Sequence, residues 1–119
     1  MNNTVELNVP SKLEYIGVAR LTSSSIANTF HLNVDQIEDI KVSVNEACVN
    51  VLNFSDSEQI KMQFSSNKDS MIIKIDSVVE NIPEGTEHTK QGEMGLLIIS
   101  SLMDEVSFED DAITMVKYI

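Results

Sequence analysis

The order in which strand-like and helix-like segments follow one another is the feature that most constrains this fold. The clearest segment spans residues 34–52, where apolar residues recur at three- and four-residue steps behind a capping-box pair, Asn33 and Gln36. This spacing predicts a long amphipathic helix with one face buried under a sheet. The residues expected in the core are Ile40, Val44, Ala47 and Val51. The opposite side carries a polar stripe of Asp39, Ser43, Glu46, Asn50 and Asn53.

The remaining segments complete a recognisable order. Alternation of apolar and polar residues predicts strands at residues 4–9, 59–64, 71–75, 106–108 and 113–118. Helical spacing predicts two more helices, residues 11–31 behind a capping box of Ser11 and Glu14, and residues 94–103. The order β-α-α-β-β-α-β-β predicts an α/β (α+β) two-layer sandwich, in which three helices cover one face of a mixed, largely antiparallel sheet. The polar connection 77–91 is long enough to suggest a functional loop.

Length and composition limit the organisation of the chain. With 119 residues, 42% of them hydrophobic, we expect a single domain over residues 1–119. No apolar run approaches the roughly 18 residues of a membrane span, and the polar start does not resemble a signal peptide. The single cysteine, Cys48, is typical of a reducing compartment, so we expect a cytoplasmic protein without structural zinc.

The charge balance bears on the choice of partner. Nineteen acidic against eight basic side chains give a net charge of −11, and the basic residues are scattered singly. Direct binding of nucleic acid is therefore not expected. The acidic excess suits a basic protein partner, or it serves only to keep a small protein in solution, and composition leaves both open.

Glu46 and Asn50 lie four residues apart on the predicted helix 34–52. Their side chains therefore leave the same face one turn apart. A carboxylate and a carboxamide in this arrangement can serve a magnesium–phosphate site, with the Glu as base and the Asn oxygen as metal ligand. The same pair is also common on an ordinary solvated helix face, so spacing alone does not decide its role.

Several stretches resemble the bacterial anti-sigma-factor serine kinases of the GHKL ATPase superfamily, whose domain is called the Bergerat fold. The matching pieces are residues 10–15, 37–50, 95–96 and 102–106, and the run Glu46-Ala47-Cys48-x-Asn50 is similar to the family's N-box. Such kinases silence a sigma factor by binding it, and they phosphorylate an antagonist protein whose unphosphorylated form releases that sigma factor. Similar proteins are commonly homodimers.

The resemblance implies a role for five residues. It implies that Glu46 is the catalytic base and that Asn50 holds Mg²⁺ within an ATP site. Asp76 matches the aspartate that accepts a hydrogen bond from adenine. Gly92 and Gly95 match a glycine-rich box that wraps the phosphates at the start of the third helix.

The chain departs from the family pattern around these residues. Val78 stands where the family has a glycine after Asp76, and a β-branched residue resists the close approach and positive φ used there. Glu93 stands in the second glycine box, where its charge repels polyphosphate. The loop 77–91 is also short for a nucleotide lid, and Lys90 is its only lysine or arginine.

Two functions follow as hypotheses. The first is a binding module, an anti-sigma-like regulator of partner switching that contacts a sigma factor, its antagonist or both, with weak or lost ATP binding. The second is an active ATP-dependent serine kinase acting on the antagonist, which the retained Glu46 and Asn50 favour. A third class, a metabolic enzyme on a similar sandwich, is less favoured because the sequence contains no recognisable site for it. For either hypothesis, net charge predicts an acidic docking surface around Glu14, Glu38 and Asp39.

Overall fold

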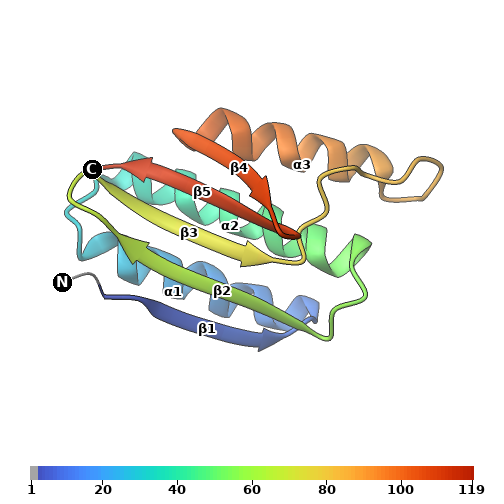
Figure 1. Cartoon of the computed structure of the whole chain (residues 1–119), viewed down its shortest axis with the longest axis horizontal. Coiled ribbons are helices and arrows are strands. Elements are labelled where there is room, and N and C mark those ends of the chain that lie inside the picture. The colour runs from blue at the N-terminus through green and yellow to red at the C-terminus, as the bar shows by residue number, and fades with distance from the viewer. Residues whose placement is uncertain (1–2) are drawn as a thin grey trace.

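The computed structural model describes residues 3–119 and has two layers, a five-stranded sheet and three α-helices (Figure 1). The strands are β1 (Val5–Pro10), β2 (Gln59–Ser66), β3 (Ser70–Asp76), β4 (Glu105–Glu109) and β5 (Ala112–Tyr118). The helices are α1 (Ile16–Asn28), α2 (Val34–Phe54) and α3 (Thr89–Leu102), with a short 3-10 helix (Leu13–Tyr15) before α1. The predicted α/β two-layer fold is confirmed.

The sheet is more regular than the sequence predicted. Its strand order is β1-β2-β3-β5-β4, and each pair of neighbours in that order is antiparallel. The expected mixed sheet is therefore antiparallel in every pairing that the structure describes. The β4–β5 hairpin has a two-residue turn, Asp110 and Asp111, both with positive φ (51° and 59°). This is the backbone of a type I′ turn, whose twist matches that of paired strands.

Helix α2 is the central helix of the second layer. Asn33 and Gln36 form the predicted capping box, with a 2.8 Å bond from the Gln36 N–H to Asn33 Oδ1 and a 2.9 Å bond from the Asn33 N–H to Gln36 Oε1. The four residues predicted for its core face, Ile40, Val44, Ala47 and Val51, are all 0% exposed. The period of the apolar residues therefore located both the start of this helix and its buried face.

The other two helices begin elsewhere than predicted. The chain after β1 forms the 3-10 helix before α1, its N-cap is Lys12 without a side-chain bond, and the capping box predicted from Ser11 and Glu14 is wrong. Helix α3 begins at Thr89 rather than Met94. The Gly92 N–H accordingly donates to the His88 carbonyl inside the first turn, at 2.9 Å.

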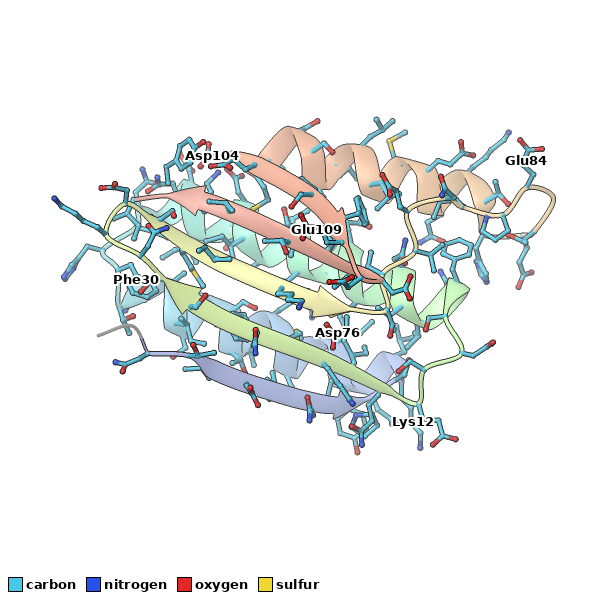
Figure 2. The ribbon with its side chains drawn as sticks, viewed as in Figure 1. Lys12, Phe30, Asp76, Glu84, Asp104 and Glu109 are labelled. Atoms are coloured by element: carbon cyan, nitrogen blue, oxygen red, sulfur yellow. The ribbon has the colours of Figure 1, made fainter. Side chains whose placement is uncertain are left out.

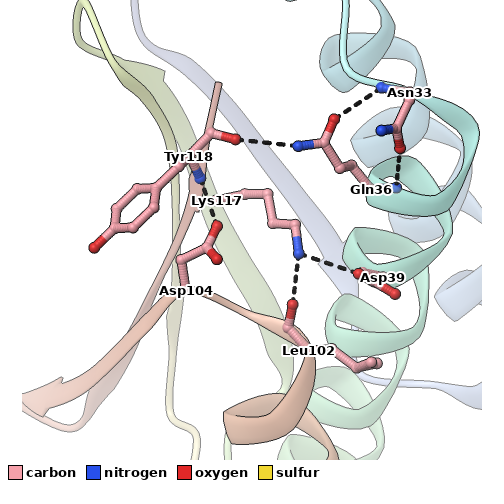
Figure 3. Close-up of polar contacts among 7 residues, drawn as sticks. All are labelled: Asn33, Gln36, Asp39, Leu102, Asp104, Lys117 and Tyr118. Atoms are coloured by element: carbon pink, nitrogen blue, oxygen red, sulfur yellow. Dashed lines mark hydrogen bonds and ion pairs between the residues drawn. The ribbon is translucent and has the colours of Figure 1, made fainter.

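Helix α3 is fixed at its C-terminal end by Lys117 of β5 (Figure 3). The Lys117 ammonium donates to the carbonyl oxygen of Leu102 at 2.6 Å and to Oδ2 of Asp39 on α2 at 3.1 Å. The Lys117 side chain is 8% exposed and that of Asp39 34%. Asp39 is thus held in this ion pair and Glu38 in another with Lys41, whereas no ion pair among residues 3–119 involves Glu14, the third residue of the expected docking surface. Within residues 3–119, no helix is long and apolar enough to cross a membrane.

Candidate functional site

The polar stripe of α2 faces other parts of the protein rather than solvent, and each of its residues is buried or half-buried. Asn50 is only 5% exposed, and Ser43 is fully buried with no hydrogen-bond partner for its hydroxyl among the described residues. Glu46 and Asn50 line a narrow crevice between α2 and α3, together with Gly92 and Gly95. The structure thus brings together four of the five residues that the sequence assigned to a site.

Both polar atoms of the Asn50 side chain are hydrogen-bonded to the loop that follows β3. Its Oδ1 accepts from the Val79 N–H at 2.7 Å, and its Nδ2 donates to the Val79 carbonyl at 3.0 Å. The side-chain amide therefore pairs with one residue of backbone as a neighbouring strand would. A metal ion at Oδ1 would have to compete with this N–H. Val79 was not singled out from the sequence, because nothing in its own residue type marks a backbone contact.

Glu46 is partly buried against α3. A Cβ added at Gly95 would lie 3.1 Å from Glu46 Oε2, so this glycine leaves room for the carboxylate. Burial raises the pKa of the Glu46 carboxyl above its ordinary value. A carboxyl with a raised pKa is suited to proton transfer, and it also makes the ionised side chain a cost to folding.

The raised pKa predicts how stability responds to Glu46→Gln. Because folding favours the neutral carboxyl, ionisation of Glu46 lowers the free energy of unfolding. This loss is absent below the unfolded pKa and is complete once the pH exceeds the raised pKa. Glutamine keeps the shape without the charge. We expect Glu46→Gln to raise Tm at pH 7, and the gain to vanish at about pH 3.5, below the ordinary glutamate pKa. Thermal melts at both pH values, with the exposed Glu84→Gln as control, test this. An equal gain at both pH values would contradict it.

Gly92 and Gly95 permit close packing of two helices. A Cβ at Gly92 would lie 2.5 Å from Cε2 of the Phe54 ring, at the end of α2. Both glycines lie within α3, so they do not form the loop before the helix that the sequence suggested. Their absent side chains instead let α3 approach α2, and the crevice between the helices measures only about 10 Å³.

Asp76 is separated from the other four residues. Along β3, Ile73 and Ile75 are buried in the core, whereas Lys74 is exposed on the open face of the sheet. The alternation of a strand places Asp76 on the same open face as Lys74, and it lines a polar depression there with Lys61 and Glu6 (Figure 2). Ser77, the next residue, turns the chain with a φ of 68°.

Cys48, inside the N-box-like run, lies in the core. It is 0% exposed, and burial raises its thiol pKa to about 12, although the Arg20 charge acts in the opposite direction. A protonated, buried thiol is a poor nucleophile. Cys48 therefore serves packing and not chemistry. Within residues 3–119, no group of three or more His, Cys, Asp or Glu side chains is placed to hold a metal ion.

Comparison with known proteins identifies the family. The model of the histidine kinase-like ATPase domain matches residues 9–118. The chain belongs to this family. Proteins named serine-protein kinase RsbW are similar over nearly the whole chain: that of Halalkalibacterium halodurans is 33% identical over 98% of the chain and 83% of the relative. That of Oceanobacillus iheyensis is 35% identical over 97% and 86%, and that of Bacillus cereus strain Q1 is 30% identical over 97% and 84%.

Histidine kinase-like ATPase domains bind ATP with Mg²⁺, and in this chain the matching residues of α2 and α3 enclose little free space. A volume of about 10 Å³ is near the lower limit for one water molecule. The amide of Asn50 is paired with Val79, and Asp76 lies on the other face of the sheet. The residues of the family site are thus present in part, but they are packed against one another.

Proposed function

We propose that this histidine kinase-like ATPase domain is an anti-sigma-factor-like regulator of a bacterial partner-switching system. It binds a sigma factor, the antagonist of an anti-sigma factor, or both, in the cytoplasm, and its ATP binding is weak or lost. Family membership and the similarity to proteins named serine-protein kinase RsbW support the class. The observation that carries the loss of ATP binding is the Asn50–Val79 pair over a crevice of about 10 Å³.

The second candidate is an active ATP-dependent serine kinase that phosphorylates the antagonist. One observation favours it, the burial that raises the pKa of the Glu46 carboxyl in the position of the family's base. In this alternative Asn50 and Asp76 contribute to nucleotide and Mg²⁺ binding, and Gly92 and Gly95 to the phosphates. The contacts at Asn50, Gly92 and Gly95 require α3 and the loop 77–88 to move from the positions described above, and the contact at Asp76 requires that residue to leave the open face of the sheet.

Calorimetry with Mg-ADP and Mg-ATP separates the two candidates. For the binding module we expect no saturation up to about 1 mM nucleotide, equivalent to a binding free energy weaker than about −4.1 kcal/mol. A sub-micromolar Kd for Mg-ATP would contradict the module and make the kinase the leading reading. Affinity capture from the native host, followed by identification of the captured proteins, tests the partner. Recovery of neither a sigma factor nor a phosphorylatable antagonist would contradict the proposed class.

A further inference from the structure

A groove of about 480 Å³ lies at the end of the sheet; it shares no lining residue with the α2–α3 crevice, although its Val79 is bonded to Asn50 of that crevice. It is formed where the segment after β3 meets the β4–β5 turn, and Asp76, Ala112 and Glu109 lie in register across the three strands at this end. Figure 2 labels Asp76 and Glu109 there. Its volume lies within the range of about 300–1,000 Å³ that is usual for ligand pockets. The groove is lined by residues 77–81, residues 108–112 and Ser55.

The groove combines an apolar lining with an acidic rim. Val79 and Phe108, both half-buried, supply the apolar side chains that remain open, and Val78 and Ala112, only 3% and 1% exposed, lie beneath them. The rim carries four exposed carboxylates, Glu80, Glu109, Asp110 and Asp111. The ion pairs formed among residues 3–119 involve none of these four. An apolar lining surrounded by unneutralised negative charge is complementary to an apolar side chain flanked by positive ones.

The walls of the groove are held in place before any ligand arrives. The Ser77 N–H donates to the Asp111 carbonyl at 2.7 Å and ties the loop to the β4–β5 turn. Asn50 ties the same loop to α2 through both polar groups of Val79. A site whose backbone is already fixed loses less conformational entropy on binding.

We propose that this groove is a docking site for a partner segment that carries one large apolar side chain flanked by lysines or arginines. The proposal rests on the proposed function as a partner-binding module and says which surface that module uses. A small cation or polyamine would neutralise the rim but leave Val79 and Phe108 exposed to water. A neutral apolar segment would leave the four carboxylates unpaired. The peptide of mixed character uses both features of the groove.

The test uses a fluorescein-labelled peptide, Lys-Arg-Leu-Lys-Arg, and fluorescence anisotropy at fixed ionic strength. A second peptide has serine in place of leucine, so both carry the same charge. We expect the leucine peptide to bind about tenfold more tightly or better, because burying a leucine side chain has an effect of that size. Equal affinity of the two peptides would show that the apolar lining is unused and would overturn the proposal.

Two double variants separate the groove from the attraction of net charge. Glu80→Lys with Asp110→Lys brings the formal charge of the four rim positions to zero, whereas Asp35→Lys with Asp69→Lys makes the same charge change at two exposed sites near the opposite end of β5. Circular dichroism confirms that each is folded. We expect at least a tenfold loss of peptide affinity in the rim variant and less than threefold in the control. Equal losses of affinity in the two variants would mean that only net charge attracts the peptide, and they would overturn the proposed docking site.

The captured partner distinguishes failure of the groove from failure of the proposed function. If a sigma factor or antagonist is captured and binds the rim variant as well as the unaltered chain, the groove is wrong and the proposed function stands. If the peptide tests succeed but neither protein is captured, the groove stands and the proposed function does not. A partner that binds the control variant but not the rim variant supports both.

Discussion

Replacing Lys117 by methionine is expected to destabilise the fold by about 3 kcal/mol, or roughly 10 °C in Tm. Methionine fills a similar volume but leaves Asp39 without its cation and the Leu102 carbonyl, at the end of α3, without its donor. A positive charge at this position also interacts favourably with the helix dipole. The estimate stays below that of a fully buried pair because the Asp39 side chain is 34% exposed. Urea denaturation followed by circular dichroism measures the loss.

A surface pair in the same chain provides the matched control. Lys41 and Glu38 lie one turn apart on α2 with a 3.0 Å contact, but their side chains are 32% and 57% exposed. Lys41→Met should therefore cost less than about 0.5 kcal/mol. A double-mutant cycle of Lys117→Met with Asp39→Asn should give a coupling of about 1–3 kcal/mol. A Lys117→Met variant as stable as Lys41→Met would show that the tie at the end of α3 contributes nothing.

Asn50→Ala is expected to cost about 2–3 kcal/mol and to free the loop after β3. The substitution removes both bonds to Val79 and leaves a backbone N–H and carbonyl without protein partners. The Val79 amide should then lose its protection from hydrogen exchange, while amides in the centre of β3 change only with global stability. Exchange measured by NMR or mass spectrometry reports this local effect.

Asn53→Ala is the control for the Asn50 prediction, because Asn53 lines the same crevice one turn further along α2 without a side-chain hydrogen bond among the described residues. We expect that variant to lose less than about 0.5 kcal/mol. The free energy of unfolding of Asn50→Asp should lie below that of Asn53→Ala. The aspartate keeps an acceptor for the Val79 N–H, but it sets a carboxylate against the Val79 carbonyl. If Asn50→Ala left the Val79 amide protected from exchange, the two Asn50–Val79 hydrogen bonds would not be what holds the loop.

Local periodicity was sufficient to predict the elements and the core, because each depends on neighbours within a turn of helix or along a strand. Asn33 and Gln36, three positions apart, were enough to locate the start of α2. The capping box expected at Ser11 and Glu14 failed because the chain there first forms a 3-10 turn. A propensity for a cap cannot show which of two helical forms the next turn adopts.

The arrangement of the candidate site depends on contacts between distant residues, which spacing does not reveal. Asn50 on α2 is hydrogen-bonded to Val79 in the loop after β3. Gly92 allows close packing because the Phe54 ring of α2 lies beside it. The acidic turn 109–111 was visible in the sequence, but only the sheet register places it beside residues 77–81. The strand alternation that puts Asp76 on the open face was in principle readable from Ile73, Lys74 and Ile75.

The two ends of α3 are held by different kinds of contact. Its C-terminal end is bound through Lys117 to both the sheet and α2, whereas its N-terminal turns face α2 with Gly92 and Gly95 beside Gln91 and Leu96, and without a side-chain hydrogen bond to α2 among the described residues. We therefore expect any widening of the space over Glu46 to be a pivot of α3 about Leu102, in which the first turns move furthest.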